Sequence, residues 1–342
     1  MSADTFQPPR WLRNPHVQSV LASSGVRRVL FRERRAALEQ GATEHILDCG
    51  HGVRLQGFYS RQRALAQPRA LAVLLHGWEG SAQSSYILHT GARLLSEGVD
   101  VFRLNFRDHG QTHHLNDELF HSCRIDEVVG AVQQIATQFS QRPLVIGGFS
   151  LGGNFALRVA LHAPAAQIPL AWVFAVCPVI SPRAGLASIE SAPWFYETYF
   201  MHKWRGSLKR KQALFPQREL FSKVELRGNM RELTRRMVQR HTQFGTLENY
   251  LDGYSIAGDT LATLRVPATI LTAADDPVIP VADFHALTLA PRTQLTIVAH
   301  GGHCGFIRDG SLRSWAEDFL IDRLQQVIGT SAQQETELAA SA

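Results

Sequence analysis

The chain has 342 residues, of which 45% are hydrophobic and 19% are charged, and its formal net charge is +5. This composition is typical of a globular protein and excludes a disordered or fibrous chain. The length predicts one large domain with an insertion, or at most two domains. Because no run of about 18 apolar residues is present, the sequence predicts no transmembrane helix.

The N-terminal stretch MSADTFQPPRWLRNPHVQ carries prolines and polar residues where a signal peptide would need an apolar segment. Four cysteines lie far apart and lack CxxC spacing: Cys49, Cys123, Cys177 and Cys304. Without a secretory signal, they are interpreted as reduced thiols rather than a disulfide framework. We therefore expect a cytoplasmic protein.

Segments with strand and helix patterns alternate along the chain, which favours an α/β fold. Residues 45–60 alternate around a Gly-His-Gly turn and predict an antiparallel hairpin. Residues 71–78 form a near-continuous apolar run, typical of a parallel strand that is buried on both faces. Further strands are predicted at 99–106, 143–149, 170–180, 267–275 and 293–300, and helices at 85–98, 124–139, 152–163, 281–290 and 311–328.

The alternation stops between Pro182 and about Thr263, where arginine, lysine and aromatic residues are frequent and no buried strand is evident. This segment is interpreted as a helical cap inserted after the sixth strand. The final segment is small and polar, so a disordered tail is expected. The sequence thus predicts a core in two parts with an insertion and a tail: 1–181, 182–263, 264–328 and 329–342.

A serine stands between glycines where a predicted strand turns into a helix, in Gly148-Phe149-Ser150-Leu151-Gly152. A nucleophilic serine needs this position, because the turn is strained and its close neighbours must be small. The alternative is a tight turn in which the serine is incidental.

A serine hydroxyl is a poor nucleophile without a base, so an acid and a histidine are expected further along the chain. Asp275 and Asp276 follow one predicted strand, and His300 and His303 follow the next. Asp276 is preferred because the proline after it holds it extended. His303 is preferred because glycines surround it, whereas His300 still belongs to the strand end.

Two backbone N–H groups are expected to stabilise an oxyanion. One belongs to Leu151, directly after the serine. The other belongs to Trp78, in the loop His76-Gly77-Trp78-Glu79-Gly80-Ser81 that follows the third predicted strand.

Together the serine turn, the HGW loop, DDPVIP and GGHCGF resemble the α/β-hydrolase superfamily, and the opening PPRWLRNPHVQ narrows the resemblance to the YheT-like hydrolases. The resemblance covers residues from about 8 to 325 and implies an α/β-hydrolase fold with Ser150, Asp276 and His303 as a catalytic triad. It also implies a serine hydrolase that cleaves carboxylic esters through an acyl-enzyme, either a carboxylesterase or a lipid-type acyl hydrolase. The alternatives are an acyltransferase with the same triad and a ligand-binding protein without turnover.

The chain departs from that family's usual Asn-x-Arg-Gly turn after the fourth strand, where it reads NFRDHGQTHHLND (105–117). A metal site is one interpretation, but the spacing matches no standard zinc motif. We instead expect these residues at the pocket mouth, with His109 and His113 as substrate contacts. Neither a metal nor another cofactor is predicted.

Residues 191–215 interleave aromatic residues with the basic run Lys209-Arg210-Lys211. Their three- and four-residue spacing predicts an apolar stripe on a helix. The stripe either packs the cap onto the core or lines an acyl pocket, with the basic run facing a phosphate group or an anionic membrane. The expected partner is a small-molecule or lipid ester rather than nucleic acid, because no recognised nucleic-acid module is present.

Overall fold

An eight-stranded sheet organises the fold, with strand order β1-β2-β4-β3-β5-β6-β7-β8. The computed structural model describes residues 6–139 and 142–340. Strands β3 to β8 are parallel to one another, and β2 is antiparallel to both of its neighbours. The predicted mostly parallel sheet is confirmed. Its strands are Ala42–Asp48 (β1), Arg54–Ser60 (β2), Ala70–Leu75 (β3), Val99–Leu104 (β4), Leu144–Phe149 (β5), Leu170–Val176 (β6), Ala268–Ala273 (β7) and Thr293–Val298 (β8).

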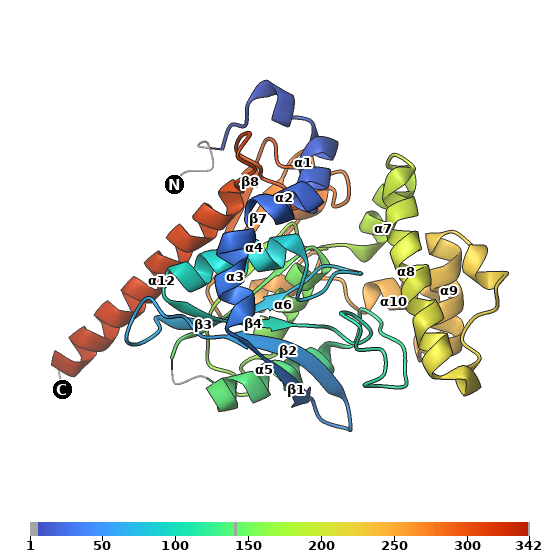
Figure 1. The fold of residues 1–342 in the computed structure, drawn as a ribbon, viewed down its shortest axis with the longest axis horizontal. Coiled ribbons are helices and arrows are strands. Elements are labelled where there is room, and N and C mark those ends of the chain that lie inside the picture. The colour runs from blue at the N-terminus through green and yellow to red at the C-terminus, as the bar shows by residue number, and fades with distance from the viewer. Residues whose placement is uncertain (1–5, 140–141, 341–342) are drawn as a thin grey trace.

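Helices cover both faces of the sheet (Figure 1). Side chains alternate along β3: Leu71, Val73 and Leu75 belong to one core, and Ala70, Ala72 and Leu74 belong to the other. Helices α5 (Ile125–Phe139) and α6 (Leu151–His162) contribute to the first core. Helices α4 (Ser85–Ser96) and α12 (Trp315–Ala340) contribute to the second. Because both faces are covered, every residue of β3, β4 and β5 is buried.

Three short helices before the sheet are not among the sequence-predicted elements: α1 (Pro15–Ala22), α2 (Gly25–Leu30) and α3 (Arg32–Gln40). Asn14 caps α1, since its side chain accepts hydrogen bonds from the N–H groups of His16 and Val17, and a proline occupies the first helical position. The apolar stripes of these helices are too short to give a clear periodicity.

Four helices lie between β6 and β7, on one side of the molecule (Figure 1): α7 (Pro182–Ser191), α8 (Phe195–Leu214), α9 (Met230–His241) and α10 (Leu247–Asp252). They share an apolar core of their own, which includes Met201, Trp204 and Leu233. Short 3₁₀ helices complete the chain at Arg10–Leu12, Pro216–Arg218, Glu225–Arg227 and Thr260–Thr263.

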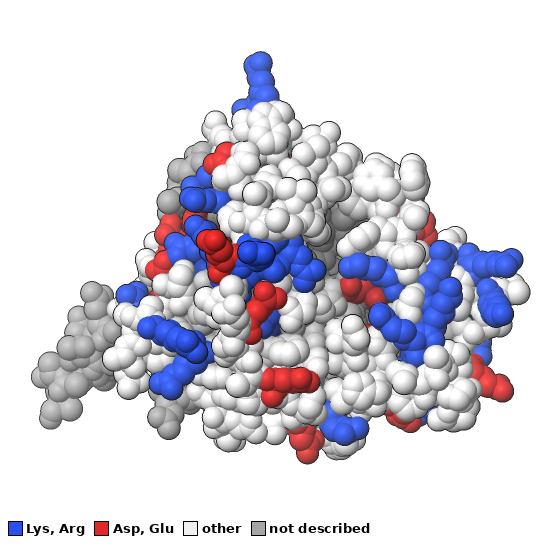
Figure 2. All heavy atoms as spheres, in the orientation of Figure 1, with Lys and Arg blue, Asp and Glu red and all other residues white. Residues whose placement is uncertain are grey.

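Basic side chains gather on the exposed surface of these helices (Figure 2). Lys209 and Arg210 are exposed, as expected. The expectation that Lys211 faces a phosphate group or membrane is wrong, because its side chain is buried. Its ammonium group donates hydrogen bonds to the Asp108 carboxylate at 2.6 Å and to the Asn116 carbonyl at 2.5 Å.

Two elements near the C-terminus differ from the sequence expectation. Helix α11 spans only Val281–His285 and ends in a turn at Ala286, whereas the sequence predicts a helix over 281–290. Helix α12 continues to Ala340, through residues that the sequence predicts to be a disordered tail. The segment is rich in alanine, glutamine and glutamate, which have high helix propensity. Among the described residues, no helix is both long and apolar enough to span a membrane.

Candidate active site

Ser150 occupies a strained turn between β5 and α6, with φ 54° and ψ −121°. Residues other than glycine rarely adopt positive φ, and such strain persists only where the surroundings enforce it. A Cβ on Gly152 would lie 2.3 Å from the Leu75 carbonyl oxygen, and one on Gly148 would lie 2.2 Å from the backbone of Gly152. The two glycines are therefore required for the turn that presents Ser150.

Asp276 and His303 form a direct pair, with Asp276 Oδ2 2.9 Å from His303 Nδ1. The other carboxylate oxygen of Asp276 accepts hydrogen bonds from the N–H groups of Val278 (2.8 Å) and Ile279 (3.0 Å). Burial by itself would lower the pKa of His303, but attraction to the Asp276 carboxylate outweighs it and raises that pKa well above its usual value. This arrangement fixes the ring orientation and stabilises the imidazolium form.

Asp275 and His300 form a second pair beside the first. Asp275 accepts a hydrogen bond from the Gly302 N–H at 2.9 Å, and its other oxygen lies 3.4 Å from His300 Nδ1. Burial raises the pKa of the Asp275 carboxyl group. Because Asp275 binds the backbone of the loop that carries His303, its contacts position that loop rather than the imidazole.

Helix α1 holds the same loop. Ser19 Oγ accepts a hydrogen bond from the His303 N–H at 2.8 Å. Gln18 donates to the Ile307 carbonyl at 3.0 Å and accepts from the Ile307 N–H at 2.6 Å. A Cβ on Gly302 would lie 2.3 Å from the Pro15 carbonyl oxygen. Sequence reasoning missed Ser19 as a site residue, although it directly follows the PPRWLRNPHVQ motif.

The two predicted oxyanion donors, Trp78 and Leu151, line the same cavity as Ser150. Leu151 is the first residue of α6, and Trp78 lies in the loop after β3, whose Gly77 would place a Cβ 3.3 Å from Ser150 Cβ. The flanking amides are occupied: Gly77 N–H donates to the Tyr86 hydroxyl at 3.0 Å, and Glu79 N–H donates to His109 Nε2 at 3.2 Å. The Trp78 amide has no acceptor among the residues that the structure describes.

The structure does not bring His109 or His113 to the cavity walls described below. His109 accepts from the Glu79 amide through Nε2, and its Nδ1 lies 2.7 Å from the Arg107 carbonyl oxygen. His113 Nε2 lies 2.8 Å from Ser207 Oγ. Burial lowers the pKa of His109 to about 4 and that of His113 to about 3, so both are neutral at pH 7. His109 thus supports the HGW loop, and His113 contacts helix α8 through Ser207.

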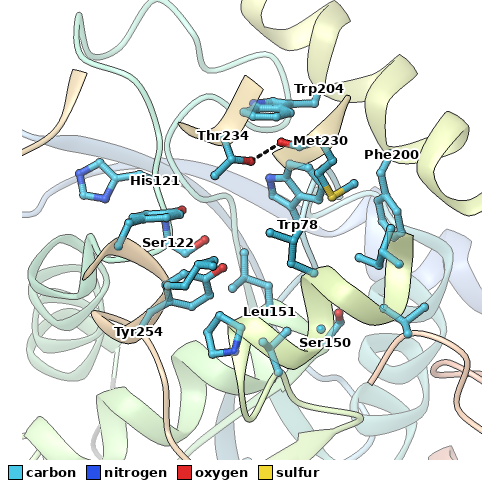
Figure 3. A pocket seen from close by; sticks show the side chains of 18 of the residues that line it. Trp78, His121, Ser122, Ser150, Leu151, Phe200, Trp204, Met230, Thr234 and Tyr254 are labelled. Atoms are coloured by element: carbon cyan, nitrogen blue, oxygen red, sulfur yellow. Dashed lines mark hydrogen bonds between the residues drawn. The ribbon is translucent and has the colours of Figure 1, made fainter. Parts of the chain in front are cut away.

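Two cavities meet at Ser150 and Trp78. A small cavity of ≈ 120 Å³ lies beneath α7–α10, and Figure 3 shows Phe200, Trp204 and Met230 around it, with Ser150 and Leu151 at one end. A wider cleft of ≈ 840 Å³ is lined by both Ser150 and His303, as well as by Lys203 and Arg210. Trp204 of the predicted aromatic stripe belongs to the apolar core of these helices and also lines the small cavity.

A mostly parallel sheet with a serine at a strained strand-to-helix turn defines the class of α/β hydrolases. The sequence pattern of the alpha/beta hydrolase family matches residues 72–312, and the chain belongs to this family.

Relatives narrow this assignment. The chain is 26% identical, over 94% of each protein, to the Escherichia coli protein named "Putative esterase YheT", which confirms the expected relationship. It is 30% identical to the pimeloyl-(acyl-carrier protein) methyl ester esterase of Stenotrophomonas maltophilia, over 69% of this chain and 86% of that protein. The structure of esterase Pf2001 from Pyrococcus furiosus has the same fold, with a TM-score of 0.55 at 14% identity over 86% of this chain and 93% of that chain. The family and these relatives support a hydrolase that acts on esters.

Proposed function

We propose that the protein is a serine hydrolase that cleaves carboxylic esters, with Ser150 as nucleophile, His303 as base and Asp276 as the orienting acid. The observation that carries this proposal is the 2.9 Å contact between Asp276 Oδ2 and His303 Nδ1, in a loop that lines the same cleft as Ser150. Among the candidate acids, Asp276 is the one whose carboxylate contacts the His303 imidazole.

The mechanism follows from these positions. His303 accepts the proton of Ser150 Oγ while Oγ bonds to the ester carbonyl carbon, and the carbonyl oxygen becomes an oxyanion. The amides of Trp78 and Leu151 donate to that oxyanion. The C–O bond to the alcohol then breaks, and His303 gives the proton to the leaving alcohol. Water attacks the acyl-enzyme by the same steps, which release the acid and restore Ser150.

The two cavities suggest how the ester lies. The small apolar cavity suits the acyl chain, because Phe200, Trp204 and Met230 offer it no charged group. The wider cleft, with its basic residues, suits the alcohol portion. We therefore expect a preference for esters with apolar acyl chains.

Labelling with a fluorophosphonate tests the proposal. The wild-type protein should gain one adduct, mapped by mass spectrometry to Ser150, and Ser150→Ala should gain none. Ser122→Ala is a matched control, since Ser122 also lines the small cavity, and it should label like the wild type. A folded wild-type protein that does not react would refute the nucleophile and favour a ligand-binding protein without turnover.

We also propose peripheral contact with anionic membranes through the exposed face of α8. Lys209 and Arg210 are exposed there, and Trp194, directly before α8, is 78% exposed. Replacing both basic residues with glutamine should weaken binding to phosphatidylserine vesicles. Lys209→Gln alone, at a position outside the cleft, should leave hydrolysis of a small soluble ester unchanged. Wild-type protein that does not sediment with such vesicles at low salt would refute this contact.

A further inference from the structure

Two cysteines adjoin the proposed site, and the proposed mechanism uses neither. Cys177 directly follows β6 and is completely buried, and Cys304 directly follows His303 and lines the wider cleft. The two residues touch, because the Cys304 N–H lies 3.4 Å from Cys177 Sγ. Neither forms a disulfide in this structure.

Together with His303, the two cysteines have the geometry of a metal-ligand set. One ligand atom each from Cys177, Cys304 and His303 can be chosen so that all three lie within 4.8 Å of one another. Both cysteines have positive φ, 46° for Cys177 and 60° for Cys304, which residues with side chains rarely adopt. The fold therefore holds both thiols beside the imidazole despite a backbone cost.

We propose that Cys177, Cys304 and His303 bind a thiophilic metal ion, with Zn²⁺ as the probe of choice, and that the bound ion blocks ester hydrolysis. Thiolate and imidazole ligands favour Zn²⁺ and Cu⁺ over hard cations. Three protein ligands leave the fourth tetrahedral position of Zn²⁺ open to water. On binding, each thiol releases its proton to solvent and its sulfur bonds to the ion, without any change in oxidation state.

Inhibition follows whichever ring nitrogen of His303 binds the ion. If Nε2 binds it, no lone pair remains to accept the proton of Ser150. If Nδ1 binds it, the ring cannot donate to Asp276, and the remaining proton stays on Nε2. In both cases His303 cannot act as the base. This consequence, unlike the metal site, rests on the proposed function.

A direct titration separates the two claims. Ser150→Ala protein, kept reduced with a phosphine, is titrated with Zn²⁺ in competition with a chromophoric zinc chelator. We expect one ion per chain. Cys177→Ala and Cys304→Ser should each weaken binding by more than about tenfold, since even outer-shell changes typically cost about 10–100-fold in metal affinity. Cys123→Ala is the matched control, because Cys123 lies outside this cluster, and it should bind like the parent protein.

The metal site is refuted if the parent protein binds no Zn²⁺, or if the folded Cys177→Ala and Cys304→Ser variants bind it as tightly as the parent. Circular dichroism verifies folding, and if Cys177→Ala does not fold, Cys304→Ser decides the matter. Ester hydrolysis by the wild type should then be lost at the Zn²⁺ concentrations that fill the site. If the protein binds Zn²⁺ but the metal-free wild type hydrolyses no ester, the proposed function is refuted and the metal site stands.

Discussion

Replacing Asp276 with asparagine tests the acid of the proposed triad. The side chain of Asp276 is fully buried, and its two oxygens accept from the His303 ring and from the amides of Val278 and Ile279. An asparagine of the same shape can keep the amide contacts, but it carries no charge to stabilise the imidazolium and favours the wrong tautomer. We expect kcat to fall by about 10⁴-fold, the size found for this change in other Ser-His-Asp triads.

The same variant should shift the pH dependence. His303 must be neutral to act as a base, so kcat/KM of the wild type falls as the pH drops below the pKa of His303. The Asp276 carboxylate raises that pKa. Removing its charge lowers the pKa, and the acid limb of the profile should therefore move to lower pH. Initial rates with a soluble ester, measured between about pH 5 and 9, would show this shift, since an unperturbed histidine titrates near pH 6.5.

Asp275→Asn is the matched control. An asparagine oxygen can still accept from the Gly302 N–H, so the loop that carries His303 should keep its position. We expect a much smaller loss of kcat and an acid limb that stays in place. A larger loss in Asp275→Asn than in Asp276→Asn would refute the reasoning and assign the orienting role to the other carboxylate.

Three further predictions concern the groups around the site. Gly152→Ala should abolish activity and destabilise the fold by about 1–3 kcal/mol, because the Cβ of the new alanine would clash with the backbone of β3. An unchanged thermal midpoint would contradict the predicted destabilisation. Lys211→Met should lower the free energy of unfolding, measured in urea, by about 3–5 kcal/mol, because it leaves the Asp108 carboxylate buried without its cation. Lys209→Met, at an exposed position, should have little effect. Equal effects of the two substitutions would show that the buried pair is unimportant. Ser19→Ala should lower kcat with little change in KM, because the His303 N–H loses its acceptor; a change in KM alone would instead indicate a role in substrate binding.

Local sequence patterns were enough to predict the main architecture. Continuous apolar runs such as 71–78 predicted buried parallel strands, and the structure confirms the sheet that they form. The placement of Ser150, Asp276 and His303 after β5, β7 and β8 also followed from the sequence, because parallel strands bring their carboxyl ends to one edge. The assignment of these residues as a triad remains a prediction that the labelling experiment tests.

Tertiary structure decided which polar side chains have partners. Lys211 belongs to a basic run that the sequence suggested would face a membrane, yet it pairs with Asp108, 103 residues away in the chain. Ser19 contacts the His303 loop across 284 residues. No local periodicity encodes such pairings, because the spacing of residues on one helix determines which face they share and not what packs against that face. Whether a charge is solvated or buried depends on the partner that long-range packing supplies, and this is why the sequence predicted the sheet but not the surroundings of its site.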